Sequence, residues 1–180
     1  MAEDARNQVW PADAVRAHRF DQDDEIPNNV LPLLVYPAAV DVSGADPAAA
    51  FERLFAGNGW GGSWRNGIFP FPHYHSTAHE VLGIARGEAR VRFGGAGVEV
   101  LRVGPGDVVV IPAGIGHQNL GASPDLLVVG AYPAGSEVDL QRGGAAERAA
   151  VERNIAGVPL PASDPVHGAD GPLLQHWRAT

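Results

Sequence analysis

Short apolar segments separated by turn residues follow one another between Trp64 and Tyr132. Residues 89–93 alternate apolar and charged side chains, as in a strand with one buried face. Residues 108–111 are apolar throughout, as in a strand buried on both faces. Glycine-rich turns such as residues 94–97 join these segments at hairpin spacing. The pattern predicts antiparallel strands that form a barrel or a jelly roll. Further strands are predicted at residues 31–36, 80–85, 98–103 and 126–131.

A helix is predicted at residues 47–56, outside the strand series. Asp46 is a good N-cap, and Pro47 suits the first helical turn. Gly57 is a natural C-terminal stop. Three apolar side chains recur at helical spacing and are expected to pack together on the outside of the sheet: Phe51, Leu54 and Phe55.

No repeat or linker divides the chain, so we expect a single domain over residues 1–180. Residues 1–30 are polar and acidic, and we expect them to form a solvated N-terminal arm. Residues 64–132 should form the core barrel. Residues 145–180 should form a C-terminal helix, over 145–156, and an apolar tail that packs on the barrel or on a partner subunit.

Composition limits the classes of function. The net charge of −8 argues against nucleic acid and anionic membranes as partners. No run approaches the length of a membrane span, and the polar N-terminus lacks the apolar stretch of a secretory signal, so a cytoplasmic location is expected. The chain has no cysteine, which excludes thiolate nucleophiles, iron–sulfur clusters and thiolate zinc sites. Any bound metal must therefore be held by nitrogen and oxygen ligands.

One segment places histidine and glutamate at spacings typical of a metal site. It contains Gly67, His73, His75, Glu80 and Gly87. A bare His-x-His pair is expected by chance roughly 0.27 times in a chain of this composition, whereas all five positions together are expected roughly 2 times in 10,000.

A second segment contains Gly106, Pro112, Gly114 and His117. This pattern is expected by chance roughly 0.01 times. Because both segments occur in one chain and in this order, we interpret them as the two halves of one metal site.

The two segments resemble the paired motifs of the cupin superfamily. The first motif is complete, and the second departs only at its last position, where Gly121 replaces an asparagine and Asn119 lies two residues earlier. Residues 26–29, 58–60 and 168–174 also resemble a bacterial subgroup of small, YjlB-like cupins. The resemblance implies a cupin-type antiparallel β-barrel, also called a double-stranded β-helix or jelly roll, with a few peripheral helices. It also implies one divalent metal ion and a homodimer, but it names no reaction.

The expected ligands are His73, His75, Glu80 and His117. Two imidazoles two residues apart point to the same face of a strand. Glu80 is out of phase with them, so a turn at residues 76–77 must reset the register before its carboxylate can point inward. His117 should come from a facing strand. Such a nitrogen and oxygen set suits Fe, Mn, Ni, Co, Cu or Zn.

Three further polar residues lie near these ligands in the sequence. His79 neighbours Glu80, so on a regular strand it faces the other way; it is a residue that supports the ligands or an alternative ligand. Gln118 and Asn119 follow His117 and are candidates to line the mouth of the site as hydrogen-bond donors.

Three functions are compatible with this site. The first is a metal-dependent oxygenase that acts on a small organic acid or an aromatic molecule. The second is a non-catalytic protein that binds a small molecule through the metal. The third is a sugar or keto-acid isomerase, which would need a further acid or base beside the metal. Apolar walls with one open metal edge would favour the first two.

Overall fold

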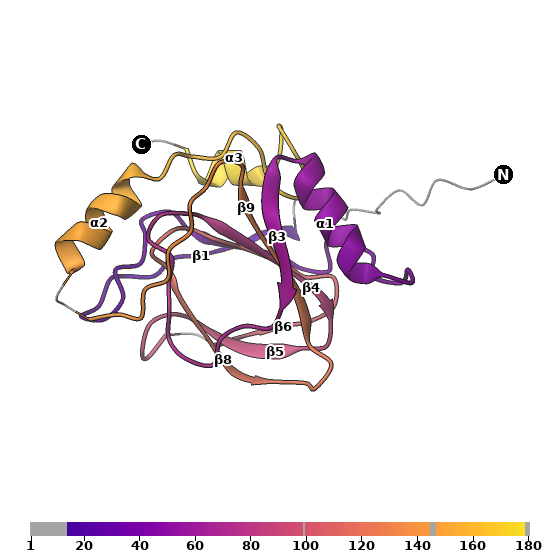
Figure 1. Ribbon diagram of the computed structural model, residues 1–180, viewed down its shortest axis with the longest axis horizontal. Coiled ribbons are helices and arrows are strands. Elements are labelled where there is room, and N and C mark those ends of the chain that lie inside the picture. Colours follow the sequence, from indigo (N-terminus) through magenta and orange to yellow (C-terminus); the bar gives the residue numbers. More distant parts are fainter. Residues whose placement is uncertain (1–13, 99, 145–146, 179–180) are drawn as a thin grey trace.

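The computed structural model, which describes residues 14–98, 100–144 and 147–178, contains two antiparallel sheets that face each other (Figure 1). The six-stranded sheet contains, in spatial order, β1 (Arg16–His18), β2 (Leu33–Tyr36), β7 (Val108–Ile111), β4 (Glu80–Arg86), β9 (Leu127–Pro133) and β3 (Trp60–Asn66). The three-stranded sheet contains β6 (Val100–Val103), β5 (Ala89–Gly94) and β8 (Gly116–Ala122). The helices are α1 (Pro47–Gly57), α2 (Arg148–Gly157) and α3 (Pro172–His176). The predicted antiparallel, mainly β architecture is confirmed.

The central strands of the larger sheet are buried on both faces. In β7, Val109 and Ile111 belong to the core between the two sheets, while Val108 and Val110 belong to a second core on the outer face. This double burial explains why every residue of β7 is apolar, as predicted. None of the helices in the described ranges combines the length and hydrophobicity needed to cross a bilayer.

Helix α1 covers the outer face of the six-stranded sheet. The Asp46 side chain caps its first turn by accepting a hydrogen bond from the Ala49 N–H at 3.2 Å, as predicted. Phe51 and Phe55 are fully buried and Leu54 is partly buried against the same cluster. The Phe51 ring packs directly on Gly83 of β4, where an added Cβ would lie 2.3 Å from it.

The end of α1 differs from the prediction. Gly57 is the last helical residue and not the stop, because Asn58 forms the C-cap with its N–H donating to Ala56 and Phe55 carbonyls. The left-handed backbone conformation that glycine favours falls instead on Gly59, at φ 81°.

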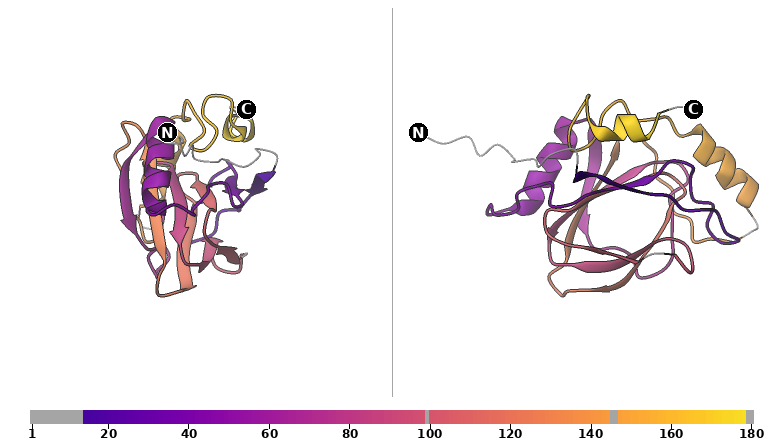
Figure 2. Two further views of the ribbon diagram at one scale, coloured as in Figure 1. Left: turned by 90° about the vertical axis from the view of Figure 1, so that its right-hand side faces the viewer. Right: turned by 180° about the vertical axis from the view of Figure 1, so that it is seen from behind.

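The C-terminal tail packs on the chain's own sheet. Leu173 and Trp177 are buried in the outer core, and the Trp177 indole N–H donates to the Pro32 carbonyl at 2.8 Å. Buried Asp164 accepts hydrogen bonds from the Tyr36 hydroxyl at 2.6 Å and the Leu173 N–H at 3.0 Å. Figure 2 shows α1 and α2 at opposite ends of the molecule, so α2 is not part of this packing. The homodimer stays a prediction, since these apolar tail residues are already covered.

The prediction of a solvated arm is wrong for residues 26–28, which are buried, whereas Asp21, Asp24 and Glu25 are exposed. Ile26 and Asn28 are buried at 3 % exposure, and the Asn28 side chain accepts a hydrogen bond from Gly116 N–H at 3.2 Å. Its amide also donates to the Asp21 carbonyl at 2.8 Å. The acidic composition of the segment gave no sign of this contact, because the partner of Asn28 lies on β8, far away in the sequence. Residues 1–13 lie outside the described ranges.

The packing of α1 predicts a clear loss of stability in Phe55→Ala. Removing a fully buried phenyl group leaves a cavity, so the free energy of unfolding should fall by about 3–5 kcal/mol. Leu54→Ala is the matched control on the same helix and should cost about 1–2 kcal/mol, because Leu54 is only partly buried. Urea denaturation followed by circular dichroism measures both. Equal losses in the two variants would contradict this arrangement.

Candidate metal centre

The two predicted motifs meet through a pair of backbone hydrogen bonds. The N–H of His73 donates to the His117 carbonyl at 3.1 Å, and the N–H of His117 donates to the His73 carbonyl at 2.9 Å. Residues directly opposite in an antiparallel pair project to the same face. The two imidazole rings therefore lie side by side, with centroids 4.0 Å apart.

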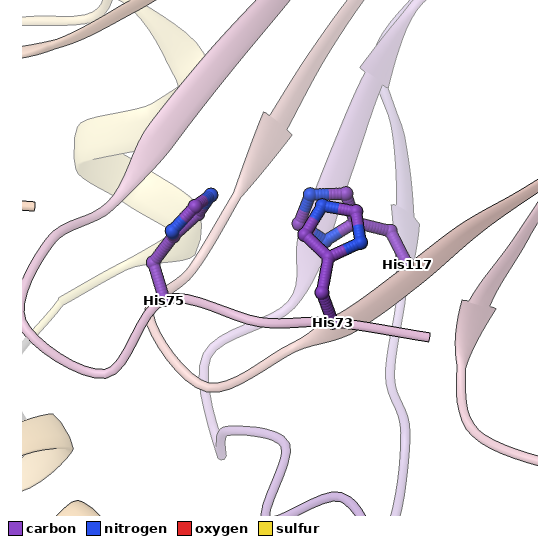
Figure 3. Close-up of side chains that lie close together, drawn as sticks. All are labelled: His73, His75 and His117. Atoms are coloured by element: carbon purple, nitrogen blue, oxygen red, sulfur yellow. The ribbon is translucent and has the colours of Figure 1, made fainter. Parts of the chain in front are cut away.

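His75 completes a cluster of three imidazoles. It lies two residues beyond His73 and projects to the same side of the chain (Figure 3). One ring nitrogen from each of His73, His75 and His117 lies within 4.8 Å of the other two. The structure thus brings together the three histidines that the two sequence segments single out.

The hydrogen bonds of the rings fix which nitrogen faces the centre. The Nδ1 atoms of His73, His75 and His117 lie 3.0, 2.5 and 3.2 Å from the carbonyl oxygens of Phe71, Asp139 and Ile115. A carbonyl only accepts, so Nδ1 carries the hydrogen in each ring. Each neutral ring then presents the lone pair of Nε2 to the shared space, which is the form that binds a metal ion.

Glu80 approaches the cluster from the other sheet. It lies on β4 and shares its inward face with Leu82. Its Oε2 atom lies 3.2 Å from His75 Nε2 and 3.4 Å from His117 Nε2. The carboxylate thus contacts two of the three imidazoles, His75 and His117, and it comes from the sheet that faces the His117 strand, β8.

A cation fits the space between these atoms. Glu80 Oε2 is buried and lacks a hydrogen bond of acceptable geometry, although it is close to two nitrogens. A carboxylate oxygen and a nitrogen lone pair repel each other unless a proton or a metal ion lies between them. The donor set of three nitrogens and one carboxylate matches that of divalent transition metals.

The pKa values favour the ligand forms of His73 and Glu80. Burial, with the neighbouring His117, lowers the pKa of His73 to about 3, so the ring is neutral near pH 7. Burial alone would raise the pKa of Glu80, but the interactions with the His117 and His75 rings outweigh it and lower that pKa, so the carboxylate is charged. His75 differs: burial lowers its pKa, yet the interaction with Glu80 raises it overall.

Asp139 holds the turn that brings Glu80 inward. Its carboxylate accepts hydrogen bonds from the Ser76 N–H at 2.6 Å, from the Ser76 hydroxyl and from the Thr77 N–H at 3.2 Å. Its own carbonyl accepts from His75 Nδ1. The predicted turn at residues 76–77 is confirmed, but Asp139 was not foreseen, because its position carries no local sequence signal.

Gln118 and Asn119 support the site from outside the ligand cluster. The side-chain amide of Gln118 donates to the Pro70 carbonyl at 3.0 Å, and that of Asn119 donates to the Ile68 carbonyl at 3.3 Å. Both side chains thereby anchor residues 68–70, which line the pocket beside the imidazoles.

His79 lies on the opposite face of the sheet. Its Nδ1 accepts a hydrogen bond from the Ala113 N–H at 3.0 Å, and its ring lies 4.8 Å from that of Trp177. Burial lowers the pKa of His79 to about 4. His79 lies two residues before Val81, which belongs to the outer core, so alternation along the chain places both side chains on the outer face. We therefore leave His79 out of the proposed ligand set.

The four residues open into a pocket of about 450 Å³. Its other walls include two residues that sequence reasoning did not single out, Trp64 and Tyr132. The Trp64 indole N–H donates to the Tyr132 hydroxyl at 2.8 Å. Burial and the nearby charge of Glu80 raise the pKa of Tyr132, so its hydroxyl stays protonated at neutral pH. Two hollows of larger volume, about 850 and 900 Å³, contain none of the four residues.

Comparison with known proteins identifies the family. Residues 64–141 match the family described as Cupin. The chain is 43% identical over 159 residues to the uncharacterized protein YjlB of Bacillus subtilis (strain 168), a match that covers 88% of this chain and 93% of that protein. The chain therefore belongs to the YjlB-like cupins, and its two facing sheets are a cupin jelly roll.

Solved structures with a similar fold are more distant. Acireductone dioxygenase from Bacillus anthracis with a cadmium ion in its active centre is 19% identical, with a TM-score of 0.37, and the match covers 50% of this chain and 62% of that chain. Oxalate decarboxylase from Bacillus subtilis is 16% identical, with a TM-score of 0.35 over 67% of this chain and 30% of that chain. Procruciferin, an 11S globulin from Brassica napus, is 20% identical, with a TM-score of 0.37 over 44% of this chain. The chain spans only 21% of procruciferin. Such low overlap says nothing about the reaction of this chain.

Removing two of the imidazoles should abolish tight metal binding. The variant His73→Ala/His117→Ala loses two of four proposed ligands, so it should retain well under one equivalent of metal after reconstitution and desalting. Elemental analysis measures the bound metal. His176→Ala removes an exposed histidine far from the cluster in sequence and should keep the wild-type content. A full equivalent of tightly bound metal in the double variant would overturn the ligand assignment.

Metal affinity should fall as the pH falls through the raised pKa of His75. Without metal, protonated His75 pairs with charged Glu80, and a metal ion must displace that proton. Displacing one proton weakens affinity by about tenfold for each pH unit below that pKa. Competition between the protein and a chelator for Co(II), from about pH 8 to about pH 5, measures this slope. An affinity independent of pH over this range would contradict the pairing.

Proposed function

We propose that this cupin binds one divalent metal ion through His73, His75, Glu80 and His117 and holds a small molecule above it in the 450 Å³ pocket. The observation that supports this proposal best is the convergence of three imidazole nitrogens beside a buried carboxylate oxygen that lacks a hydrogen bond and lies 3.2 and 3.4 Å from two of the rings. A bound ion would supply Lewis-acid polarisation of a coordinated ligand and, in the case of Fe(II), redox chemistry with O₂.

Four protein ligands leave about two positions of an octahedral ion open. Those positions would face the pocket, whose lining includes all four proposed ligands together with Trp64 and Tyr132. A small molecule can therefore reach the ion directly, which a structural metal site would not require.

Among the three functions, we propose an oxygenase that acts on a small organic acid or aromatic molecule. An isomerase would need a base near the metal, and the described residues of the pocket wall offer only one titratable group besides the proposed ligands, Tyr132. Because its pKa is raised, Tyr132 is protonated at neutral pH and cannot serve as that base. Its hydroxyl can instead donate a hydrogen bond to a bound ligand.

Metal substitution and oxygen consumption test the two parts of this proposal separately. Azide added to the Co(II) protein should change its visible spectrum, because open positions accept an exogenous ligand. The Fe(II) protein should consume O₂ with at least one member of a panel of small aromatic acids and hydroxyketones, above the rate of the His73→Ala/His117→Ala control. An unchanged Co(II) spectrum would indicate a closed structural ion. Azide binding without O₂ consumption would favour the non-catalytic binding protein.

A further inference from the structure

The pocket beside the proposed metal ligands has an unusual charge distribution. Among its described lining residues, the only charged side chain that is not an imidazole is the carboxylate of Glu80. The chain contains no lysine, so arginine is the only permanent cation available to it. No arginine is among the described residues that line this pocket.

Two arginines contact neighbours of the proposed ligands: Arg92 lies 3.5 Å from the Gln118 side chain, and Arg142 lies over the Phe71 ring. Both arginines line a neighbouring pocket of about 170 Å³, which shares His117 with the metal-site pocket and also contains the acidic residues Asp23 and Glu25. The guanidinium of Arg142 lies 3.4 Å above the ring of Phe71, which itself is not part of the metal-site pocket. Among the described residues of the metal-site pocket, a ligand above the proposed ion therefore meets no arginine.

This charge distribution disfavours small dianions. A divalent ion and one carboxylate together carry a net charge of about +1, which a singly charged ligand neutralises. A dianion such as oxalate would leave an uncompensated negative charge among apolar walls, and burying an unpaired charge is costly.

The walls provide apolar and aromatic contacts. Trp64, Ile68, Phe69 and Leu82 line the pocket. Phe69 is 46 % exposed and stacks on Phe71, with ring centroids 4.8 Å apart and an interplanar angle of 17°. Because Phe71 is in turn covered by Arg142, Phe69 is held at one end of a stack beside the pocket. Its exposed surface is available to an aromatic ligand.

The polar groups of the wall complement oxygen atoms on a ligand. The Tyr132 hydroxyl accepts a hydrogen bond from the Trp64 indole N–H, and a phenol hydroxyl can also donate its proton to an oxygen atom of a ligand. The volume of about 450 Å³ lies within the range of pockets for small organic ligands and far exceeds what oxalate or azide would fill.

We propose that the ligand of this pocket is an aromatic molecule that chelates the metal through two neighbouring oxygens as a single negative charge. This inference rests on the proposed function, because it needs the metal ion as the anchor of the two oxygens. It adds that the aromatic ring contacts Phe69 and that the pocket rejects dicarboxylates.

A matched pair of probes tests the aromatic contact. Benzohydroxamate and acetohydroxamate chelate through the same two oxygens and carry the same charge, but only the first has a phenyl ring. On the Co(II) protein, benzohydroxamate should bind about tenfold tighter or more, because its ring is removed from water. Phe69→Ala should reduce that preference several-fold. Phe69 is partly exposed, so this variant should fold.

A gain of affinity tests the charge argument. For each chelator, the affinity for the Co(II) protein is divided by its affinity for free Co(II) in water. This ratio should be lower for oxalate than for either hydroxamate. Asn66 is exposed on the pocket wall, so Asn66→Arg can add the missing cation without disturbing the core. This variant should bind oxalate several-fold tighter, whereas Asn66→Gln should not.

The outcomes separate the ligand class from the metal site. Failure of the protein to retain Co(II), or of every chelator to change its spectrum, would overturn the proposed function itself. Co(II) binding with equal affinity for the two hydroxamates, or a phenyl preference that survives Phe69→Ala unchanged, would overturn the aromatic ligand alone. An oxalate ratio as high as that of the hydroxamates would overturn the exclusion of dianions.

Discussion

The candidate site depends first on the paired backbone hydrogen bonds between His73 and His117. The two residues belong to separate motifs, and this pairing aligns the motifs directly opposite each other. Directly opposed residues of an antiparallel pair project their side chains to the same face of the sheet. The backbone pairing alone therefore places both imidazoles on one face. The amides of Gln118 and Asn119 extend the pairing along residues 68–70. The fold therefore positions these two proposed ligands without a metal ion.

A second constraint is the turn between His75 and Glu80. On a continuous strand the odd spacing would send their side chains to opposite faces. The carboxylate of Asp139 fixes the turn through Ser76 and Thr77, while its carbonyl orients the His75 ring. Burial raises the pKa of Asp139, but the hydrogen bonds from Ser76 and its neighbours outweigh it and hold that pKa below its ordinary value. Asp139 thus fixes both the turn that sets the register of β4 and the orientation of the His75 ring.

The sequence predicted those features that depend on local periodicity. Once a turn had brought Glu80 inward, alternation predicted that His79 faces the other way, and the unbroken apolar run of β7 indicated burial on both faces. The motif spacings selected the three imidazoles that converge. Asp46 signalled the start of α1 through its capping side chain.

Features that depend on long-range contacts were not predictable in this way. Trp64 and Tyr132 meet because β3 pairs with β9, and nothing in either segment indicates that pairing. Asp139 acts from a segment that follows the last strand, and its hydrogen-bond partners lie more than sixty residues earlier in the chain. The polar residues before β2 looked like an exposed arm, yet the Asn28 side chain completes a hydrogen bond to β8. The composition of a segment does not show which distant residues the segment contacts in the folded protein.

Two glycines on neighbouring strands connect the stability of the fold to the shape of the pocket. Gly83 of β4 points outward and gives the Phe51 ring a place on the sheet, so α1 can approach closely. Gly130 of β9 lies on the opposite face, where an added Cβ would be 2.1 Å from the Trp64 indole. Without a side chain there, Trp64 lies directly on the strand and its N–H reaches Tyr132 at 2.8 Å. Any larger residue at Gly130 would push the indole away from the sheet and toward the space that a ligand needs. The lack of a side chain at Gly83 therefore lets α1 pack closely on the sheet, and the lack of one at Gly130 leaves room for a ligand above the proposed metal ion.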